Sequence, residues 1–413
     1  MTAREAAVGM IPRSLPVRAL DLPDTPLLRF SRVSLYVTLA ALPLYVVRWH
    51  YGPLPTTLLE TLILVTVLTY VVARFRQGMR RPLATPLDIP IAVLLVAGAV
   101  SVAVAEDHRG ALGLYRAYFI EPVLLYYVAV DLLRTDVDLK RLVLAFAIGS
   151  SAFAVMNLVV FYQALMANTV RVGAAPSALY GDANYVAMYM EPPFALGVAL
   201  LVLGKNASWK ALGAGWAVLT GAALLVSFSK GAFVAMIVLA GVVVITVPRW
   251  RWAVGAGVVA AAVIATQVPL MMARLATVLI SFNGRQELFG ATTAMLRTSP
   301  LLGVGLGGYK YNFHGVTPEI YPHLMWLTFW VEIGIVGMLA FGVIFFLLLW
   351  QGWRAWPRTS GFERVVLWGA LGGLMLWLVH GFVDSPYWKN DMSVEFWILA
   401  SIQVVTLRAL RTR

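Results

Sequence analysis

Apolar runs of about twenty residues recur from one end of this chain to the other. Each run is long enough to cross the hydrocarbon core of a bilayer as an α-helix. Only 13% of the residues are charged, whereas a water-soluble domain carries about a quarter. A soluble surface is therefore excluded. The sequence predicts an all-α, polytopic integral membrane protein with about twelve transmembrane helices.

The expected spans follow one another with short connections. We place them at residues 33–49, 55–73, 87–105, 111–131, 140–165, 184–203, 208–227, 230–247, 252–270, 323–350, 364–383 and 392–408. With an even number of spans, the basic loops between them and both basic chain ends fall on one side of the membrane. The positive-inside rule assigns that side to the cytoplasm. The net charge of +12 is thus explained by membrane orientation. We therefore expect no nucleic acid as a partner and expect the chain to contact the lipid bilayer.

The chain divides into a tail and a single transmembrane domain. Residues 1–31 contain no continuous apolar stretch of the kind found in signal peptides, so we expect them to form a cytoplasmic N-terminal tail. Residues 32–413 form the transmembrane domain, with a long external loop at 271–321. Within that loop Asn283 is placed to cap a short amphipathic helix that begins near Gly284 and ends before Pro300. Its predicted apolar face comprises Leu288, Ala291, Met295 and Leu296.

Four cations are expected on or near the external side, where positive charge is disfavoured. Lys230 lies in a tight hairpin, Arg285 and Arg297 lie on the loop helix, and Arg116 lies about six residues inside the fourth span. A pocket for an anionic headgroup explains them, because Arg and Lys both bind phosphate. The alternatives are snorkelling to the interface or pairing with an acid, for which the candidates are Glu121, Glu191 and Glu287.

His323 is the candidate for proton transfer, since it stands at the outer start of the tenth span and an imidazole titrates near neutral pH. Glu332 lies deeper on the same span, where we expect it to be protonated or paired and to have a structural role. His380 and Asp384 are four residues apart, which a local hydrogen bond explains as well as catalysis does. No group of His, Asp and Glu has metal-ligand spacing, and the chain has no Cys, so we predict no metal and no cofactor.

The glycine-rich segment 303–308 has no strand–turn–helix context, so we interpret it as a turn that returns the chain to the membrane and not as a nucleotide loop.

Four stretches in this order resemble the O-antigen ligase and O-antigen polymerase superfamily. They are GDANYVA at 181–187, SFSKGAF at 227–233, RQELFGATTAMLRTSPLLGVGLGGY at 285–309 and HLMWLTFWVEIGIVG at 323–337. The resemblance covers somewhat under half of the chain. It implies a GT-C-like, metal-independent and inverting glycosyltransferase in the inner (plasma) membrane of a bacterium. Its donor would be a glycan on undecaprenyl diphosphate, and its acceptor a sugar hydroxyl of lipid A-core or a similar glycan, at the outer face.

The resemblance also implies roles for individual residues. His323 matches the histidine expected to activate the acceptor hydroxyl, and Arg285 matches an arginine expected to hold the donor diphosphate. Lys230 stands where many members have arginine, so the charge is kept but bidentate geometry is lost. Leu324 departs from the polar residue that many members have. Arg116 is a further candidate for the diphosphate, and the expected supporting residues are Arg297, Asn184 and Glu121.

Three alternatives to the ligase stay open at this point. A polymerase that joins two lipid-linked glycans uses the same donor chemistry. An anion transporter also has many spans, although its charges usually lie near the midplane between repeated halves. A catalytically inactive assembly partner is the third.

Overall fold

A computed structural model describes residues 24–52, 54–78, 84–171, 173–276, 278–315 and 319–412. Long helices dominate these residues, and the only sheet among them is a two-stranded hairpin. The chain is therefore an all-α polytopic membrane protein, as the apolar runs predict. Most of the predicted tail, residues 1–23, lies outside the described residues, and helix α2 already begins at Pro26.

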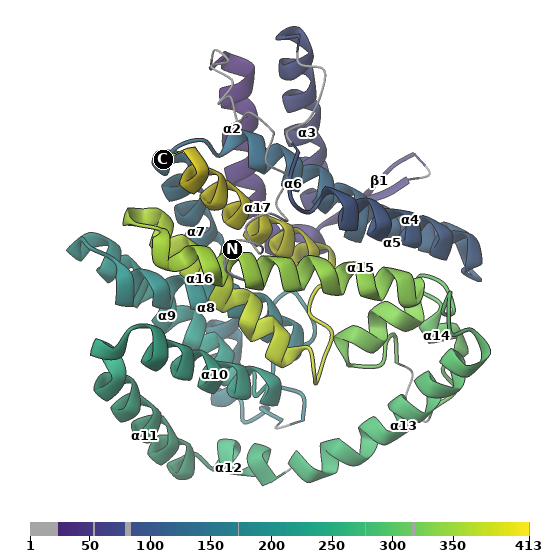
Figure 1. Cartoon of the computed structure of the whole chain (residues 1–413). Coiled ribbons are helices and arrows are strands. Elements are labelled where there is room, and N and C mark those ends of the chain that lie inside the picture. Colours follow the sequence, from purple (N-terminus) through teal and green to yellow (C-terminus); the bar gives the residue numbers. More distant parts are fainter. Residues whose placement is uncertain are drawn as a thin grey trace, which may run out of the picture.

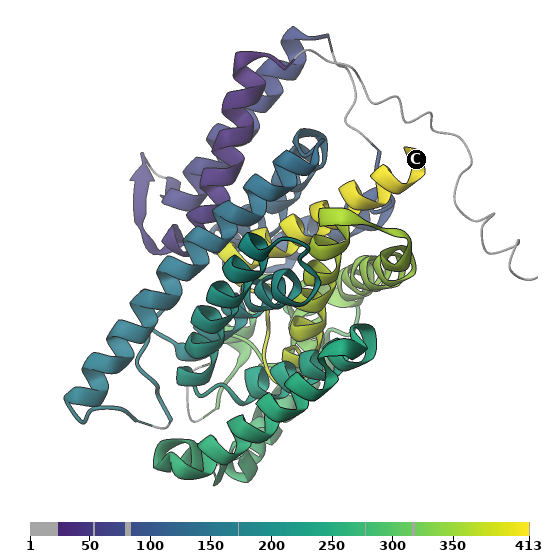
Figure 2. The ribbon, with the colours of Figure 1, turned by 90° about the vertical axis from the view of Figure 1, so that its left-hand side faces the viewer.

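The N-terminal half contributes α2 to α7 and the hairpin. Their bounds are α2 Pro26–Ala40, η1 Leu42–Val46, β1 Arg48–Tyr51, β2 Leu54–Thr57, α3 Leu58–Arg76, α4 Asp88–Val104, α5 His108–Tyr115, η2 Arg116–Ile120, α6 Glu121–Leu132 and α7 Asp136–Met166. In Figure 2 the long α7 runs along one edge of the molecule beside α2.

The C-terminal half contributes the helices that carry most of the buried core. Their bounds are α8 Ala183–Leu203, α9 Ala207–Val226, α10 Lys230–Thr246, η3 Pro248–Trp250, α11 Arg251–Gln267, α12 Pro269–Ala276, α13 Val278–Thr298, α14 Tyr309–Asn312, α15 Met325–Ala355, η4 Trp356–Arg358, α16 Gly361–His380 and α17 Asn390–Thr412. Figure 1 shows α11, α12 and α13 as an arc that leaves the bundle after α10 and returns to it near α14.

Seven described helices are long and apolar enough to span a membrane, or eight if the bent pair α10 and α11 forms one span. These two helices meet at an angle of 117°, where Pro248 interrupts the backbone hydrogen bonding. Each of the twelve expected spans overlaps a helix, but α2 and α4 are shorter than a full span. The number of crossings thus stays a prediction, while the membrane class is established.

The first expected span is wrong in its extent. Helix α2 ends at Ala40, because Pro43 cannot continue the helical hydrogen bonding, and the chain then enters β1. Strands β1 and β2 pair antiparallel, with Arg48 opposite Thr57. The expected span at 55–73 therefore starts as a strand, and helix α3 begins only after the capping box of Thr57 and Glu60.

The expected fourth span contains a local irregularity. Its helix passes through the π-helical segment η2, just before Pro122. A proline has no N–H, so the carbonyl of Tyr118 four residues earlier loses its usual partner. The hydroxyl of Tyr387 donates to this carbonyl at 2.7 Å and so joins the span to the segment before α17.

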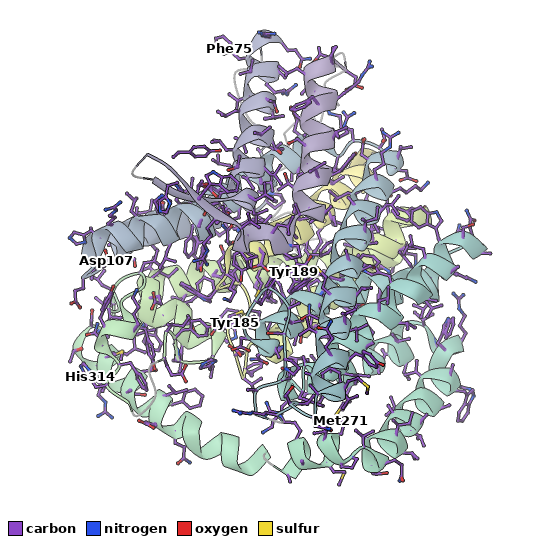
Figure 3. All side chains as sticks on the ribbon, turned by 180° about the vertical axis from the view of Figure 1, so that it is seen from behind. Phe75, Asp107, Tyr185, Tyr189, Met271 and His314 are labelled. Carbon is purple, nitrogen blue, oxygen red and sulfur yellow. The ribbon has the colours of Figure 1, made fainter. Side chains whose placement is uncertain are left out.

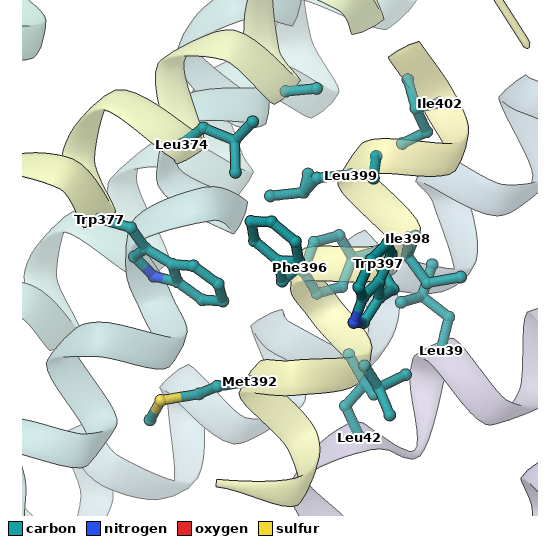
Figure 4. Packing of buried hydrophobic residues seen from close by; sticks show 14 of the residues in the cluster. Leu39, Leu42, Leu374, Trp377, Met392, Phe396, Trp397, Ile398, Leu399 and Ile402 are labelled. Carbon is teal, nitrogen blue, oxygen red and sulfur yellow. The ribbon is translucent and has the colours of Figure 1, made fainter. Parts of the chain in front are cut away.

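The core lies where α17 meets α16, α2 and η1. Figure 4 shows Phe396 and Trp397 of α17 between Trp377 of α16 and the leucines Leu39 and Leu42. These five side chains are almost wholly buried. Helix α16 also packs against α8, so α8, α16 and α17 lie together at the centre of the bundle.

The long loop expected at 271–321 is helical over much of its length. Helix α13 begins at Val278, so the expected cap at Asn283 lies inside the helix and that detail is wrong. The apolar residues Val278 to Phe282 extend the helix towards the N-terminus. Leu288, Met295 and Leu296 are buried together, with Ala291 packed against them, in a second core that also contains Val331 of α15.

The glycine-rich segment after α13 binds to a break in α15. Gly334 interrupts that helix with a φ of 75°. Val304 N–H donates to the carbonyl of Val331 at 2.7 Å, and Ile335 N–H donates to that of Leu301 at 3.0 Å. The segment is thus a turn that joins the loop to the membrane helix, as its sequence context predicts.

Candidate functional site

His323 lies between two carboxylates in the turn before α15. Its Nδ1 is 3.0 Å from Asp384 Oδ1, and its Nε2 is 3.1 Å from Glu319 Oε2. Because a carboxylate oxygen accepts hydrogen bonds, both ring nitrogens carry protons in this arrangement. Burial lowers the pKa of His323, but the charges and hydrogen bonds of Asp384 and Glu319 outweigh it and raise the pKa to about 10. His323 is therefore an imidazolium at neutral pH.

The backbone of His323 has a φ of 51°, in the left-handed region that non-glycine residues seldom adopt. The following residues anchor this turn, since Met325 N–H donates to the carbonyl of Gly381 at 2.9 Å. The turn before α15 and the turn after α16 are thus joined. This contact brings His323 next to Asp384.

Asp384 is almost completely buried in the turn that follows α16. Its carboxylate accepts the Ser385 N–H at 2.7 Å and also the side-chain amide of Asn184. Burial raises the pKa of Asp384, but the charge and hydrogen bond of His323, the charge of His380 and the Ser385 N–H hold it below its ordinary value. An ionised carboxylate at this point fixes the tautomer and the orientation of the imidazole.

Asn184 continues the polar contacts from Asp384 into the membrane core. Ser229 donates its hydroxyl to the Asn184 carbonyl oxygen at 2.5 Å. His380 Nε2 lies 3.4 Å from the Ser229 hydroxyl, and His380 Nδ1 lies 2.6 Å from Glu191. His380 and Glu191 are both almost completely buried. Side chains from α8, α10 and α16 therefore form a continuous chain of polar contacts that ends at His323.

Lys230 stands at the first position of α10, directly after Ser229, which caps this helix. It is half-buried. Lys230 is adjacent in sequence to a residue of the polar chain that leads to His323. Of the predicted residues, Asn184 is the one that the described contacts join to His323, through Asp384.

Aromatic side chains form one side of the cluster. The ring of Tyr321 lies 5.0 Å from that of His323, and its hydroxyl bonds to Tyr185 of α8. Lys389 places its ammonium 3.6 Å from the centre of the Tyr185 ring, a cation–π contact. Figure 3 labels Tyr185 near the middle of the molecule, surrounded by helices. Burial lowers the pKa of Lys389.

Arg116 takes part in a separate cluster near the hairpin. It forms ion pairs with Glu60 at 2.7 Å and with Glu121 at 3.2 Å. Asn390 also donates to Glu60, at 3.0 Å. Of the two explanations for Arg116, pairing with an acid is the one observed, and Glu121 is a partner that the sequence suggests.

A cavity of about 690 Å³ adjoins this cluster. It lies between the hairpin, α5, η2 and the start of α17, and its lining includes Arg48, Trp49, Arg116 and Lys389. Lys389 belongs both to this lining and to the aromatic side of the histidine cluster. The cavity therefore offers cations and aromatic rings to a ligand.

Two predicted cations are not joined to the cluster by the described contacts. Arg297 is exposed near the end of α13 and forms no ion pair with a residue that the structure describes. Arg285 belongs to α13 by its backbone, and its side chain lies outside the described residues.

The sequence reasoning missed three features of the site. Glu319 is one, although its spacing of four residues from His323 was a usable signal. The pairing of Asp384 with His323 and the pairing of His380 with Glu191 are the others. The described contacts do not include the expected bond between the side chains of His380 and Asp384, which have Glu191 and His323 as partners. Only their backbones are joined, by the Asp384 N–H that donates to the His380 carbonyl at 2.9 Å.

Glu332 has the structural role expected of it. Its carboxyl group accepts the backbone N–H groups of Gly307 and, at 3.1 Å, Tyr309. It therefore holds the glycine-rich turn against α15 and lies outside the histidine cluster.

Comparison with known families finds a match for a segment that contains His323 and some of the residues around it. Residues 215–342 match the model of a family described as O-antigen ligase. The matched segment runs from α9 into α15 and includes Lys230, Arg285, Glu319 and His323. The chain has no significant match among curated proteins.

Proposed function

We propose that this chain transfers a glycan from undecaprenyl diphosphate to the hydroxyl of an acceptor sugar, because residues 215–342 match the model of a family described as O-antigen ligase. The observation that carries this proposal is His323, held between Asp384 and Glu319 within 3.1 Å of each. Such a grouping suits the removal of a proton from an attacking hydroxyl. The acceptor in this proposal is lipid A-core or a similar glycan.

The chemistry forms one bond and breaks one. The acceptor oxygen attacks the anomeric carbon while the bond to the diphosphate breaks, so the lipid diphosphate leaves with the electron pair. Attack from the opposite side inverts the anomeric centre. The protein then has to orient the two substrates, take the hydroxyl proton and stabilise the charge of the leaving group.

The proton transfer needs a change at Nε2 of His323. In the resting cluster this nitrogen is protonated and faces Glu319, so it cannot accept a proton. When the acceptor hydroxyl displaces Glu319 from Nε2, the imidazole loses one of the two carboxylates that keep it charged and releases its Nε2 proton to water. The neutral Nε2 then accepts the proton of the attacking hydroxyl. Asp384 keeps the opposite nitrogen protonated and the ring in place.

For the donor diphosphate we propose Lys230 and Arg285. Lys230 stands beside Ser229 at the start of α10, and Arg285 belongs to α13, so both lie within the matched segment. A lysine supplies a point charge and an arginine supplies a planar fork, and both suit a diphosphate. We leave Arg116 out of this group because two carboxylates already neutralise it. Arg297 stays a supporting candidate at the loop surface.

For the glycan itself, the cavity lined by Trp49, Arg48 and Lys389 supports the proposal. Aromatic rings and cations are suitable partners for sugars that carry acidic groups. We place this machinery at the outer face of a bacterial inner membrane, with twelve spans and both termini in the cytoplasm, because the basic loops favour that orientation.

The test uses purified full-length protein in nanodiscs with a labelled undecaprenyl-diphosphate oligosaccharide and a chelator. Lipid A-core is offered as one acceptor and a second copy of the donor as the other. We expect release of the lipid diphosphate with glycan transfer, and loss of both in His323→Gln. His314→Gln, which changes an exposed histidine of the same loop, is the matched control and is expected to stay active.

The acceptor that reacts separates a ligase from a polymerase. If folded protein transfers glycan to neither acceptor, the proposed function is wrong. If His323→Gln keeps full activity, the transferase assignment survives but the role of His323 does not.

A further inference from the structure

Helices α8, α10 and α16 reach the histidine cluster with one end and a basic hollow with the other. Asn184, Ser229 and His380 mark the first ends. At the opposite ends a hollow of about 630 Å³ lies between the end of α8, the start of α9, the end of α10 and the start of α16. A helix of the length of α8 is about 30 Å long, so the hollow and the histidine cluster lie at opposite faces of the bundle.

Four of the residues lining this hollow are basic and none is acidic. The basic ones are Lys205, Lys210, Arg249 and Arg364. They come from three separate segments of the chain, which the ends of the helices bring together around one space. Positive charge in short loops is expected on the cytoplasmic side, but that rule does not require the charges to converge on a cavity.

Elsewhere on the same face the basic residues have acidic partners. Arg74 and Arg134 both form ion pairs with Asp131, at 3.2 Å and 3.1 Å. Lys205 and Lys210, in contrast, form no ion pair with any residue that the structure describes. The charge around the hollow is therefore left for an anion from outside the chain to balance.

The other two cations are held in place by contacts that leave their charge uncompensated. Arg249 donates to the carbonyl of Val202 in the last turn of α8. The guanidinium of Arg364 lies over the ring of Trp356, 4.6 Å from the ring centre. Each contact orients its arginine side chain but supplies no negative charge. Both guanidinium groups are therefore oriented and still able to bind a phosphate.

We propose that this basic hollow binds the phosphate of an anionic phospholipid from the cytoplasmic leaflet. The hollow lies where the membrane helices end, which is the depth of lipid headgroups. Its remaining lining includes Leu203, Val247 and Val365, which are suitable neighbours for the apolar part of a lipid. Basic pockets between transmembrane helices on this side are suited to such headgroups. This site does not depend on the proposed transferase activity.

The test measures lipid binding to the full-length protein by native mass spectrometry, with phosphatidylglycerol and phosphatidylcholine as probes. The variant Lys205→Gln/Lys210→Gln removes the two lysines, which are exposed and so not needed for packing. We expect it to bind phosphatidylglycerol about tenfold more weakly than the wild type. The control is Arg76→Gln/Arg358→Gln, which removes two exposed cations of the same face outside the hollow.

Wild-type and control proteins are expected to prefer phosphatidylglycerol and to bind it equally. Equal binding of the two lipids by the wild type, or undiminished binding by the lysine variant, overturns the proposal. Inorganic phosphate is a further arm, read as the shift in unfolding temperature in detergent. If phosphate at the same concentration stabilises the protein as much as phosphatidylglycerol does, the ligand is a soluble anion and the lipid assignment is wrong.

Discussion

His323 has carboxylates on both ring nitrogens, and each of these contacts has a separate consequence for the proposed reaction. Asp384 is buried and lies on the inner side of the imidazole, whereas Glu319 is partly exposed. The inner contact orients the ring, and the outer contact occupies the position that an acceptor hydroxyl needs. Substitutions at these two residues should therefore behave differently.

Asp384→Asn removes the negative charge beside Nδ1 and leaves the size of the side chain unchanged. We expect glycan transfer to fall about 10²-fold or more, because the imidazole loses the group that fixes its tautomer. The measurement is the initial rate of glycan transfer by protein in nanodiscs. Asp136→Asn, an exposed residue at the start of α7 on the opposite face, is the control. Unchanged rates in Asp384→Asn would show that the ion pair has no part in the reaction.

Glu319→Gln should shift the dependence of the rate on pH. In the wild type the pKa of His323 is raised to about 10, so the neutral imidazole becomes more populated, and the rate higher, as pH rises towards that value. Removing one of the two carboxylates lowers this pKa. The rise in the normalised rate should then occur at lower pH in the variant. If the normalised rate profiles of the wild type and the variant superimpose between about pH 6 and about pH 10, this assignment is wrong.

At the scale of the elements, the break in α15 determines how the external loop meets the membrane helix. Gly334 has a positive φ, and the carbonyl of Leu301 occupies the position that a Cβ would take. Gly303 also has a positive φ, and the carbonyl of Val331 occupies the position that its Cβ would take. The loop and the helix therefore fit together only because both backbones lack a side chain at the contact. Since His323 lies between this loop and α15, the contact also positions the site.

Gly334→Ala should destabilise this contact by about 1–3 kcal/mol, because alanine at positive φ is strained and its methyl group meets a backbone carbonyl. The measurement is the unfolding temperature in detergent, which we expect to fall. Gly342→Ala in the same helix is the matched control, since the nearest atom to a Cβ there is in the Trp326 ring at 3.7 Å. Equal stability of the two variants would mean that the loop does not depend on this break.

At the scale of the whole molecule, the polar histidine cluster and the basic hollow lie at opposite ends of the same helices. One end gathers the acids and histidines of the proposed reaction, and the other gathers uncompensated cations. The orientation of the bundle in the membrane decides which end meets which compartment.

The absence of Cys from the sequence makes this orientation directly measurable. We introduce single cysteines at Asn168, in the turn after α7, and at Asn206, before α9. In intact cells a membrane-impermeant maleimide should label Asn168→Cys and leave Asn206→Cys unlabelled until the membrane is opened. The reverse pattern would place the histidine cluster in the cytoplasm and would contradict the proposed function as well as the proposed lipid leaflet.

The sequence by itself determined the class of this protein and several parts of its site. Length and hydropathy of the apolar runs are local properties, so they were sufficient to predict an all-α membrane protein. His323 and Asn184 were identified from short motifs, and in the structure both contact Asp384. The role of Lys230 stays a prediction. The apolar face of α13 followed from helical spacing in the same way.

Only the tertiary structure decided the partners of these residues. Asp384 is 61 residues from His323 and 200 from Asn184, and no local pattern relates such positions. Arg116 was expected at the diphosphate, but packing places it beside Glu60, 56 residues away. The pairing of β1 with β2 was likewise not expected from hydropathy, although Pro43 was a local signal for the early end of α2. Hydropathy selects which segments enter the membrane, whereas the pairing of their charges depends on how the helices pack against one another.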